Sequence, residues 1–412
     1  MTRYPLEGYR VADFGWIWAG AALGHYLADM GAEVIRIESR KKLDGLRMGR
    51  PIPGRDIAKG DKGEEPEVQP TFHCINRSKM GITMDMNDSE ATPFLKRLVS
   101  LSDIVVENYN PRVMKKAGLD YESLRAIKPD IVMISLPSAG QYGPRRDIIT
   151  YGSSVAAISG LSSLVGYADK EVLGIGQITY PDPTSATFGL IAVLMAIYHR
   201  NRTGEGQHID LAQWETTSGL LGEAIMDYTM NGRVMGTHGT RHPTMVPHNN
   251  YPAQGEDKWV SIAVKTDEEW QDLCRAMGKP AWCKEERFAD KFSRQRNVEE
   301  LDKLIAAWTK DYEPYALTEL LQKFGVAAMP VMNIEDQYFN PHLQERQVYI
   351  EVEHPMVGPE TLYNLAWKLS DTPGGVKGPA HMLGQHNDYV FKELMGLPEE
   401  QVDDLVVRKV MH

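Results

Sequence analysis

The chain is poor in cysteine and has no long apolar run. Its 412 residues include three cysteines, Cys74, Cys274 and Cys283, none of them in a CxxC spacing. The sequence therefore predicts free thiols, with no disulfide framework and no metal site. The N-terminal residues carry no apolar signal segment, and no stretch reaches the roughly 20 apolar residues that a membrane helix needs. We expect a cytoplasmic protein with no membrane partner.

Positive charge is also in short supply. The formal net charge is −11 and the isoelectric point is about 5.6. A binder of nucleic acid needs a basic face, so no nucleic-acid partner is expected. Local basic clusters nevertheless follow strand-like segments, and they fit either a small phosphate-bearing ligand or solvated surface turns. These clusters are Arg40–Lys42, Arg77 with Lys79, Lys115–Lys116 and Arg145–Arg146.

Strand-like and helix-length segments alternate in the first part of the chain. This rhythm predicts an α/β fold with a Rossmann-like, doubly wound parallel sheet. The glycines Gly15, Gly20 and Gly24 do not have the GxGxxG spacing, so a dinucleotide site is not indicated. The segments are strands at 10–14, 32–38, 81–86, 103–107 and 130–135, with a helix rich in small residues at 19–30.

Composition changes along the chain indicate a second domain. The stretch 231–252 is rich in Gly, His, Pro and Asn, and a predicted strand at 259–264 is followed by helix-length segments. Turns rich in Pro and Gly then precede a terminal amphipathic segment. We expect a large domain over 1–224, a smaller α+β domain over 225–331, and a linker and tail over 332–412 that returns to the large domain.

One acidic residue stands out at the start of an apolar helix. Asp182 precedes the run 187–198, which is apolar on nearly every face and predicts a helix buried on all sides. Asp followed by Pro is also typical of a helix N-cap, so a structural role is the first alternative. The second is a nucleophile, since a carboxylate beside free backbone N–H groups at a helix start has oxyanion stabilisation at hand.

Taken together, several motifs resemble the class III CoA-transferase family, which includes formyl-CoA transferase and the carnitine and benzylsuccinate CoA-transferases. The resemblance covers essentially the whole chain. It rests on Val11–Phe14, Ala19–Gly20, Asp29–Glu38, Asn76–Lys79, Val106–Tyr109, Arg202–Gln207, Gly325–Pro330 and Leu383–His386.

The resemblance implies roles for individual residues. Asp182 occupies the place of the family's nucleophile, which favours the catalytic alternative over the cap. Coenzyme A is implied as a substrate, with no other cofactor. Its implied binding residues are Trp18, Ala19, Arg40, Lys79, Asn108, Tyr109 and Lys116. Residues implied for the acid substrate or for a closing loop are Trp16, Ser138, His238 and Gly239.

The implied reaction moves CoA from an acyl-CoA, with succinyl-CoA as a candidate, to a carboxylic acid through an aspartyl anhydride and an aspartyl-CoA thioester. Trp16 and Trp18 resemble the benzylsuccinate-type branch, although packing would explain them equally. A racemase-like member of the family is disfavoured, because no histidine lies between His73 and His199. A non-catalytic partner subunit would not need Asp182. The family further implies an interlocked dimer, either with itself or with a related subunit.

Overall fold

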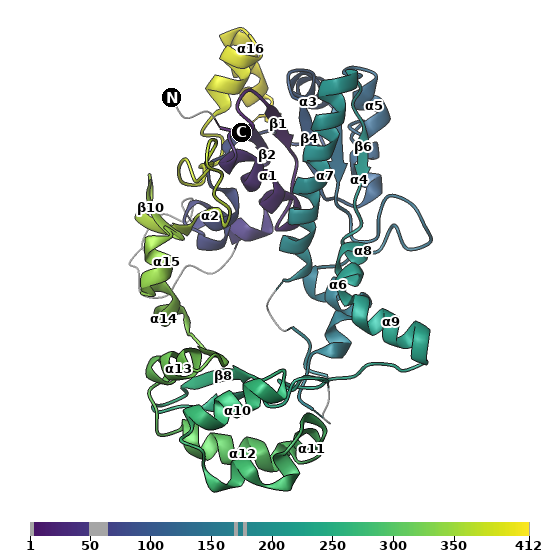
Figure 1. The fold of residues 1–412 in the computed structure, drawn as a ribbon. Coiled ribbons are helices and arrows are strands. Elements are labelled where there is room, and N and C mark those ends of the chain that lie inside the picture. The colour runs from purple at the N-terminus through teal and green to yellow at the C-terminus, as the bar shows by residue number, and fades with distance from the viewer. Residues whose placement is uncertain (1–3, 49–64, 169–171, 176–178, 412) are drawn as a thin grey trace. The chain divides into compact units, whose positions relative to one another are not determined.

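The computed structural model describes residues 4–48, 65–168, 172–175 and 179–411 (Figure 1). It divides into two compact units. The first contains residues 1–161, 175–226 and 342–412, and the second contains 162–174 and 227–341. The sequence pattern gave no sign that 162–174 belongs with the second unit. The domain limits expected at 224 and 331 stay predictions.

A six-stranded parallel sheet forms the centre of the first unit. Its strand order, β3-β2-β1-β4-β5-β6, is that of doubly wound dinucleotide-binding folds, so the predicted Rossmann-like sheet is confirmed. In this order, the chain passes to the other half of the sheet after β3, and the two halves meet where β1 pairs with β4. The strands are β1 (Arg10–Asp13), β2 (Glu33–Glu38), β3 (Met80–Thr83), β4 (Ile104–Glu107), β5 (Val132–Ser135) and β6 (His208–Asp210).

Helices cover both faces of this sheet, and side chains that alternate along each strand supply two separate cores. In β4, Ile104 and Val106 belong to the first core and Val105 to the second. The first core is covered by α1 (Ala19–Asp29), α2 (Pro70–Asn76) and α7 (Pro181–Thr203). The second is covered by α3 (Thr92–Ser100), α4 (Pro111–Lys116), α5 (Tyr121–Arg125), a π-helical turn (Tyr389–Leu394) and α16 (Glu399–Val407).

The second unit has a core of its own beside a three-stranded antiparallel sheet of order β7-β8-β9. Its strands are β7 (His248–Pro252), β8 (Trp259–Ala263) and β9 (Ala327–Pro330). Its main helices are α10 (Asp267–Ala276), α11 (Lys291–Arg296), α12 (Val298–Thr309) and α13 (Pro314–Lys323). This confirms the predicted α+β class.

The remaining elements connect these parts. They are α6 (Gly152–Ile158), α8 (Gln213–Ser218), α9 (Gly222–Asn231), α14 (Ile334–Tyr338), α15 (Pro341–Glu345) and the hairpin β10 (Tyr349–His354) with β11 (Gly358–Tyr363). The three cysteines are free thiols, as predicted. Among the described residues, no helix combines the length and the apolar character needed to cross a bilayer.

Helix α7 lies along α1 in the first unit (Figure 1). The prediction that it is buried on every side is wrong for the single chain. One side enters the first core, but the other exposes five large apolar side chains to between 42% and 64%. Their spacing of three or four residues places them on one side of the helix. We call this set the exposed α7 stripe: Phe188, Ile191, Leu194, Met195 and Tyr198.

Within the first unit, a buried ionic cluster fastens the C-terminal tail to the segments that precede it in sequence. The guanidinium of Arg47 donates to both carboxylate oxygens of Glu38 at 2.8 and 2.9 Å, to Glu67 at 2.9 Å, and to the carbonyl of His381 at 3.1 Å. Burial lowers the pKa of His381 to about 4, so its ring is neutral and donates from Nε2 to Glu38 at 2.8 Å. At Gly81, an added Cβ would lie 1.8 Å from the His381 ring, so only glycine fits beneath the ring.

Removing Arg47 should therefore loosen the tail. We expect Arg47→Met to lower the free energy of unfolding by about 3–5 kcal/mol, because it leaves two buried carboxylates without their cation. The exposed Arg125→Met provides the control, and urea unfolding followed by tryptophan fluorescence provides the measurement. Equal midpoints for the two variants would show that the cluster does not hold the tail.

Candidate active site

Asp182 lies in the first turn of α7 and is 9% exposed. The helix begins at Pro181, with Tyr180 in the cap position, so Asp182 is the second helical residue and not the cap. Its backbone N–H donates to the carbonyl of Thr179 at 3.1 Å. The cap interpretation is therefore wrong, and the side chain of Asp182 remains available for another role.

The starts of two further helices meet the Asp182 carboxyl group. Gly152 is the first residue of α6, and a Cβ added to it would lie 2.2 Å from Oδ2 of Asp182. Ala19 is the first residue of α1, and its backbone N–H acts on the carboxyl group by lowering the pKa of Asp182. The positive ends of α1, α6 and α7 therefore converge on one acidic side chain. Backbone N–H groups at such helix starts favour an anion in their vicinity.

Burial raises the pKa of Asp182 to about 6, and the backbone N–H groups of Asp182 and Ala19 only partly offset this effect. The carboxylate is thus ionised at neutral pH but weakly solvated. A carboxylate with few water contacts is a better nucleophile than one in bulk water, because less solvent must be removed before it attacks. The site can accordingly hold a reactive carboxylate.

A network of buried charges supports the turn that leads into α1. Lys79 donates to Asp13 at 2.7 Å, to the carbonyl of Ala21 at 2.8 Å and to Asn76 at 3.1 Å. These bonds use all three N–H groups of the ammonium, and burial lowers the pKa of Lys79 to about 8. The expected contact between Lys79 and a CoA phosphate stays a prediction, since in this arrangement all three N–H groups of Lys79 hold the turn.

Two acidic residues in this network, which the sequence did not single out, hold the turn directly. Asp13 accepts the backbone N–H of Gly15 at 2.7 Å, and Asp44 accepts that of Ile17 at 3.0 Å. Arg36, fully buried, pairs with both carboxylates. Ile17 itself has a φ of 57°, an unfavourable value for a β-branched residue, so these contacts maintain a strained turn.

Asn108 clamps the same turn from the end of β4. Its side-chain Oδ1 accepts the N–H of Trp16 at 2.6 Å, and its Nδ2 donates to the carbonyl of Trp16 at 2.8 Å. A Cβ at Gly20 would lie 2.7 Å from Asn108 Oδ1. Close packing of this kind accounts for the glycine at position 20, the second residue of α1.

Two small cavities meet at Tyr109, where strands of the sheet end. One of about 140 Å³ is lined by Trp16, Glu38, Lys42 and Tyr109, among others. The other, of about 130 Å³, is lined by residues that include Asn108, Tyr109, Ser138 and Thr150. Ligands of doubly wound sheets bind at the carboxyl ends of the strands, which is where these cavities lie. Thr150 in turn is two residues from Gly152, which contacts Asp182.

The other predicted residues take up diverse positions. Trp18 is half-buried against the first core, Arg40 is exposed and donates to the carbonyl of Leu383 at 3.2 Å, and Lys116 is exposed at the end of α4. The hydroxyl of Ser138 pairs with that of Thr150. Because His238 and Gly239 belong to the second unit, their expected role near the acid substrate stays a prediction.

Glu107, at the end of β4, is a buried carboxyl group that the sequence analysis missed. Its Oε2 accepts the N–H of Tyr109 at 2.7 Å, and burial raises its pKa to about 7. In the sequence, only its position immediately before Asn108 and Tyr109 could have indicated a role for Glu107 near the site. Glu107 fixes the backbone from which both of these predicted CoA-binding residues extend.

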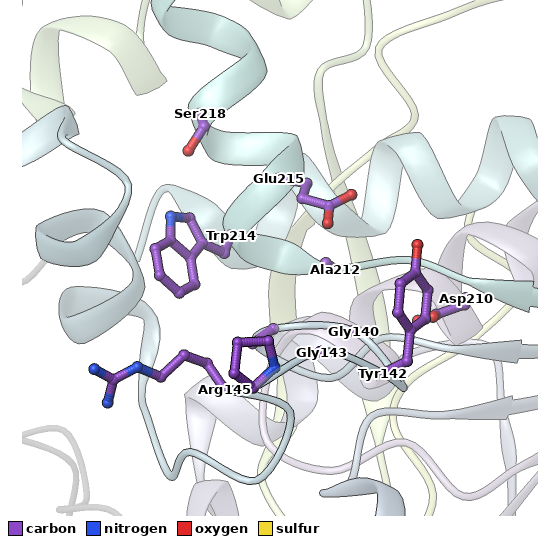
Figure 2. A pocket seen from close by; sticks show the side chains of 11 residues that line it. Gly140, Tyr142, Gly143, Arg145, Asp210, Ala212, Trp214, Glu215 and Ser218 are labelled. Carbon is purple, nitrogen blue, oxygen red and sulfur yellow. The ribbon is translucent and has the colours of Figure 1, made fainter.

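A larger cavity, of about 590 Å³, lies beside the loop that follows β5 (Figure 2). Trp214 and Arg145 line one side, and Tyr142 with Asp210 lines the other (Figure 2). Asp210 fixes the loop by accepting the N–H of Gln141 at 2.9 and 3.0 Å. For the part of the chain that the structure describes, no group of three or more His, Cys, Asp or Glu side chains could hold a metal ion.

Comparisons with known proteins concern the family and the fold of the chain. A family model described as CoA-transferase family III matches residues 6–387. Succinyl-CoA–D-citramalate CoA-transferase of Chloroflexus aurantiacus is 34% identical over 407 residues, covering 99% of this chain and 98% of that protein. Succinyl-CoA–L-malate CoA-transferase beta subunit, from the same organism, is 29% identical, covering 100% and 99%. The crystal structure of a CAIB/BAIF family protein from Brucella suis has a TM-score of 0.84 at 30% identity, covering 95% of this chain and 100% of that chain.

Burial of the Asp182 carboxyl group should lower the stability of the folded state by an amount that depends on pH. Because folding raises the pKa of this carboxyl group to about 6, the folded state loses stability as the pH rises from about 4 through 6. Above that window the loss reaches about 3 kcal/mol. We expect Asp182→Asn to unfold at a higher urea concentration than the parent at pH 8, and to lose this advantage at pH 4. The exposed Asp403→Asn controls for charge, and an advantage that does not change with pH would contradict the assignment.

Proposed function

Because the chain belongs to CoA-transferase family III, we propose that Asp182 is the covalent nucleophile with which it moves coenzyme A from an acyl-CoA to an acid. The protein is a CoA-transferase, and CoA is its substrate. The observation that carries the proposal is the Asp182 carboxylate, buried where α1, α6 and α7 begin and poised with a raised pKa. The reaction steps below use only Asp182, CoA and the two acids.

In the first half-reaction, a carboxylate oxygen of Asp182 attacks the thioester carbonyl of the donor. The carbon–sulfur bond breaks, CoA leaves as a thiolate, and a mixed anhydride joins Asp182 to the donor acyl group. The thiolate then attacks the aspartyl carbonyl of the anhydride and displaces the donor acid. Asp182 now carries CoA as a thioester, and no water has been consumed.

In the second half-reaction, the acceptor carboxylate attacks the aspartyl thioester and again releases the CoA thiolate. The thiolate attacks the acceptor's carbonyl in the new anhydride, which forms the product thioester and restores the Asp182 carboxylate. Negative charge develops on a carbonyl oxygen at each attack, and we propose that N–H groups at the start of α1 stabilise it.

We assign CoA to the path through the two cavities that share Tyr109. The adenosine end would occupy the cavity beside Trp16 and Lys42, and the pantetheine arm would pass Ser138 and Thr150 toward Asp182. Arg40 and Lys116 replace Lys79 as candidates for the phosphates, because both are exposed. A charged side chain facing phosphate gives a strong hydrogen bond.

For the acids, we propose succinyl-CoA as the donor and a small dicarboxylic acid as the acceptor, by analogy with the two named relatives. The benzylsuccinate-type alternative rested on Trp16 and Trp18. In the structure, the Trp16 ring lies 6.2 Å from that of Tyr109, and Trp18 packs against the first core. Neither position favours an aromatic acid. Benzylsuccinate can be assayed beside the small dicarboxylic acids for comparison.

Oxygen transfer tests the nucleophile directly. When the acceptor is labelled with ¹⁸O in its carboxylate, each turnover should leave one labelled oxygen on Asp182, because the bridging oxygen of the second anhydride stays with the enzyme. Mass spectrometry of the peptide containing Asp182 should detect this label. Asp182→Ala should lose transfer by several orders of magnitude while Asp403→Asn keeps it. Turnover that leaves Asp182 unlabelled would rule out the mechanism.

We also propose that a second chain covers the exposed α7 stripe, which is too apolar and too continuous for a solvent-facing helix side. A second copy of this chain is the simplest occupant. A related subunit is the alternative, since one relative is named as a beta subunit. Interlocked chains would bury more than the roughly 1,600 Å² of a standard interface, so the folded monomer should be scarce.

A charge within the exposed α7 stripe should disrupt this assembly. We expect wild-type protein to sediment as a dimer at nanomolar concentration and Ile191→Glu to sediment as a monomer or to aggregate, because its carboxylate would be buried without a partner. Val407, 79% exposed on α16, supplies the control Val407→Glu. A wild-type monomer, or an Ile191→Glu dimer of unchanged stability, would contradict the proposal.

A further inference from the structure

The two cysteines of the second unit belong to one hydrophobic core and lie on neighbouring segments of the chain. Cys274 is in the last turn of α10, and Cys283 follows on a short 3₁₀ helix, Ala281–Lys284. Both residues are buried, with exposed fractions of 3% and 7%. They are free thiols in this structure, and the proposed transfer of CoA uses neither of them.

The chain folds back between the two cysteines, which brings their segments together. The carbonyl of Cys274 accepts the backbone N–H of Lys279 at 2.8 Å and so reverses the chain at the end of α10. The ring of Trp270, one turn before Cys274, lies 6.2 Å from that of Trp282. Trp282 directly precedes Cys283, so the two segments pack side by side with one thiol on each.

The two thiols also act on each other. Hydrogen bonding between their side chains raises the pKa of Cys274 and lowers that of Cys283. Because such bonding acts only over contact distance, the sulfur atoms face each other inside the core. The fully buried guanidinium of Arg294 adds a positive charge nearby, which partly offsets the increase at Cys274. A positive charge beside a thiol pair favours the thiolate, the form that reacts with oxidants.

The positions of the two cysteines distinguish the parts that they can play. Cys274 is the more deeply buried, and it lies at the carboxyl end of α10, where the helix dipole disfavours a thiolate. Cys283 is slightly more exposed and is followed by the basic residue Lys284. Cys283 is therefore the better attacking thiol, and Cys274 is the better resolving thiol. Redox-sensing cysteines commonly have a resolving thiol beside them.

We propose that Cys274 and Cys283 are a reversible oxidation site, at which a small disulfide such as oxidised glutathione converts the two thiols to a disulfide. The Cys283 thiolate attacks one sulfur of the reagent, whose S–S bond breaks and releases a glutathione thiolate. Cys274 then attacks the Cys283 sulfur of this mixed disulfide and displaces the second glutathione. The two thiol protons pass to the two glutathione thiolates, so the protein loses two electrons and the reagent gains them. The step takes place within the second unit alone.

The test uses the full wild-type chain under native conditions, treated with excess oxidised glutathione and quenched in acid. We expect the pair to lose about two mass units, and peptide mapping without reductant to link the peptide containing Cys274 to that containing Cys283. Dithiothreitol should reverse both changes. Cys74, in the first unit, is the third thiol of the chain, and Cys74→Ala should form the same link at the same rate.

The single variants test the two parts separately. We expect Cys274→Ala to accumulate a mixed disulfide between Cys283 and glutathione, because no resolving thiol remains. Cys283→Ala should form a mixed disulfide at least about tenfold more slowly, since its remaining thiol is the more buried one. Far-UV circular dichroism checks that both variants are folded, and the wild-type experiment needs no variant.

Two unchanged thiols at Cys274 and Cys283 in the treated wild-type chain would overturn the proposal. A link from either of them to Cys74, or to a second chain, would overturn it as well. Equal rates of mixed-disulfide formation in the two single variants would contradict the assignment of Cys283 as the attacking thiol.

Discussion

The burial of one carboxylate where three helices begin is the constraint on which the active site depends. The Asp182 carboxyl group contacts Gly152 so closely that no side chain fits there, and burial raises its pKa to about 6. The doubly wound sheet makes this possible, because its helices follow strands whose carboxyl ends share one edge. The positive ends of α1, α6 and α7 then compensate part of the lost hydration.

Charges buried beneath the site serve its geometry more than its chemistry. Lys79, Asp13 and Arg36 form a closed network whose members hold the strained turn before α1. Asn108 clamps the same turn from β4, and Glu107 supports the backbone next to it. Because this network uses all three N–H groups of Lys79, exposed bases are the better candidates for contacts with phosphate.

Local periodicity was sufficient to predict the parallel sheet, the helix after Asp182 and the α+β class of the second unit. It was not sufficient for contacts between distant segments. Packing of the helices brings Ala19 and Gly152 to Asp182. The N–H groups of Lys79 bind Asp13 and the carbonyl of Ala21, and no rule of sequence spacing relates these residues to Lys79. The apolar run of α7 appeared uniform in sequence, although only one side enters the core of the chain.

The central claim is that Asp182 becomes covalently linked to CoA. It is tested most directly by mixing the enzyme with succinyl-CoA alone, quenching in acid and determining the mass of each peptide. The account predicts that the peptide containing Asp182 gains the mass of CoA less one water, and that sodium borohydride removes this adduct by reducing the thioester. A CoA adduct on another residue, or transfer between acids without any covalent adduct, would contradict the account.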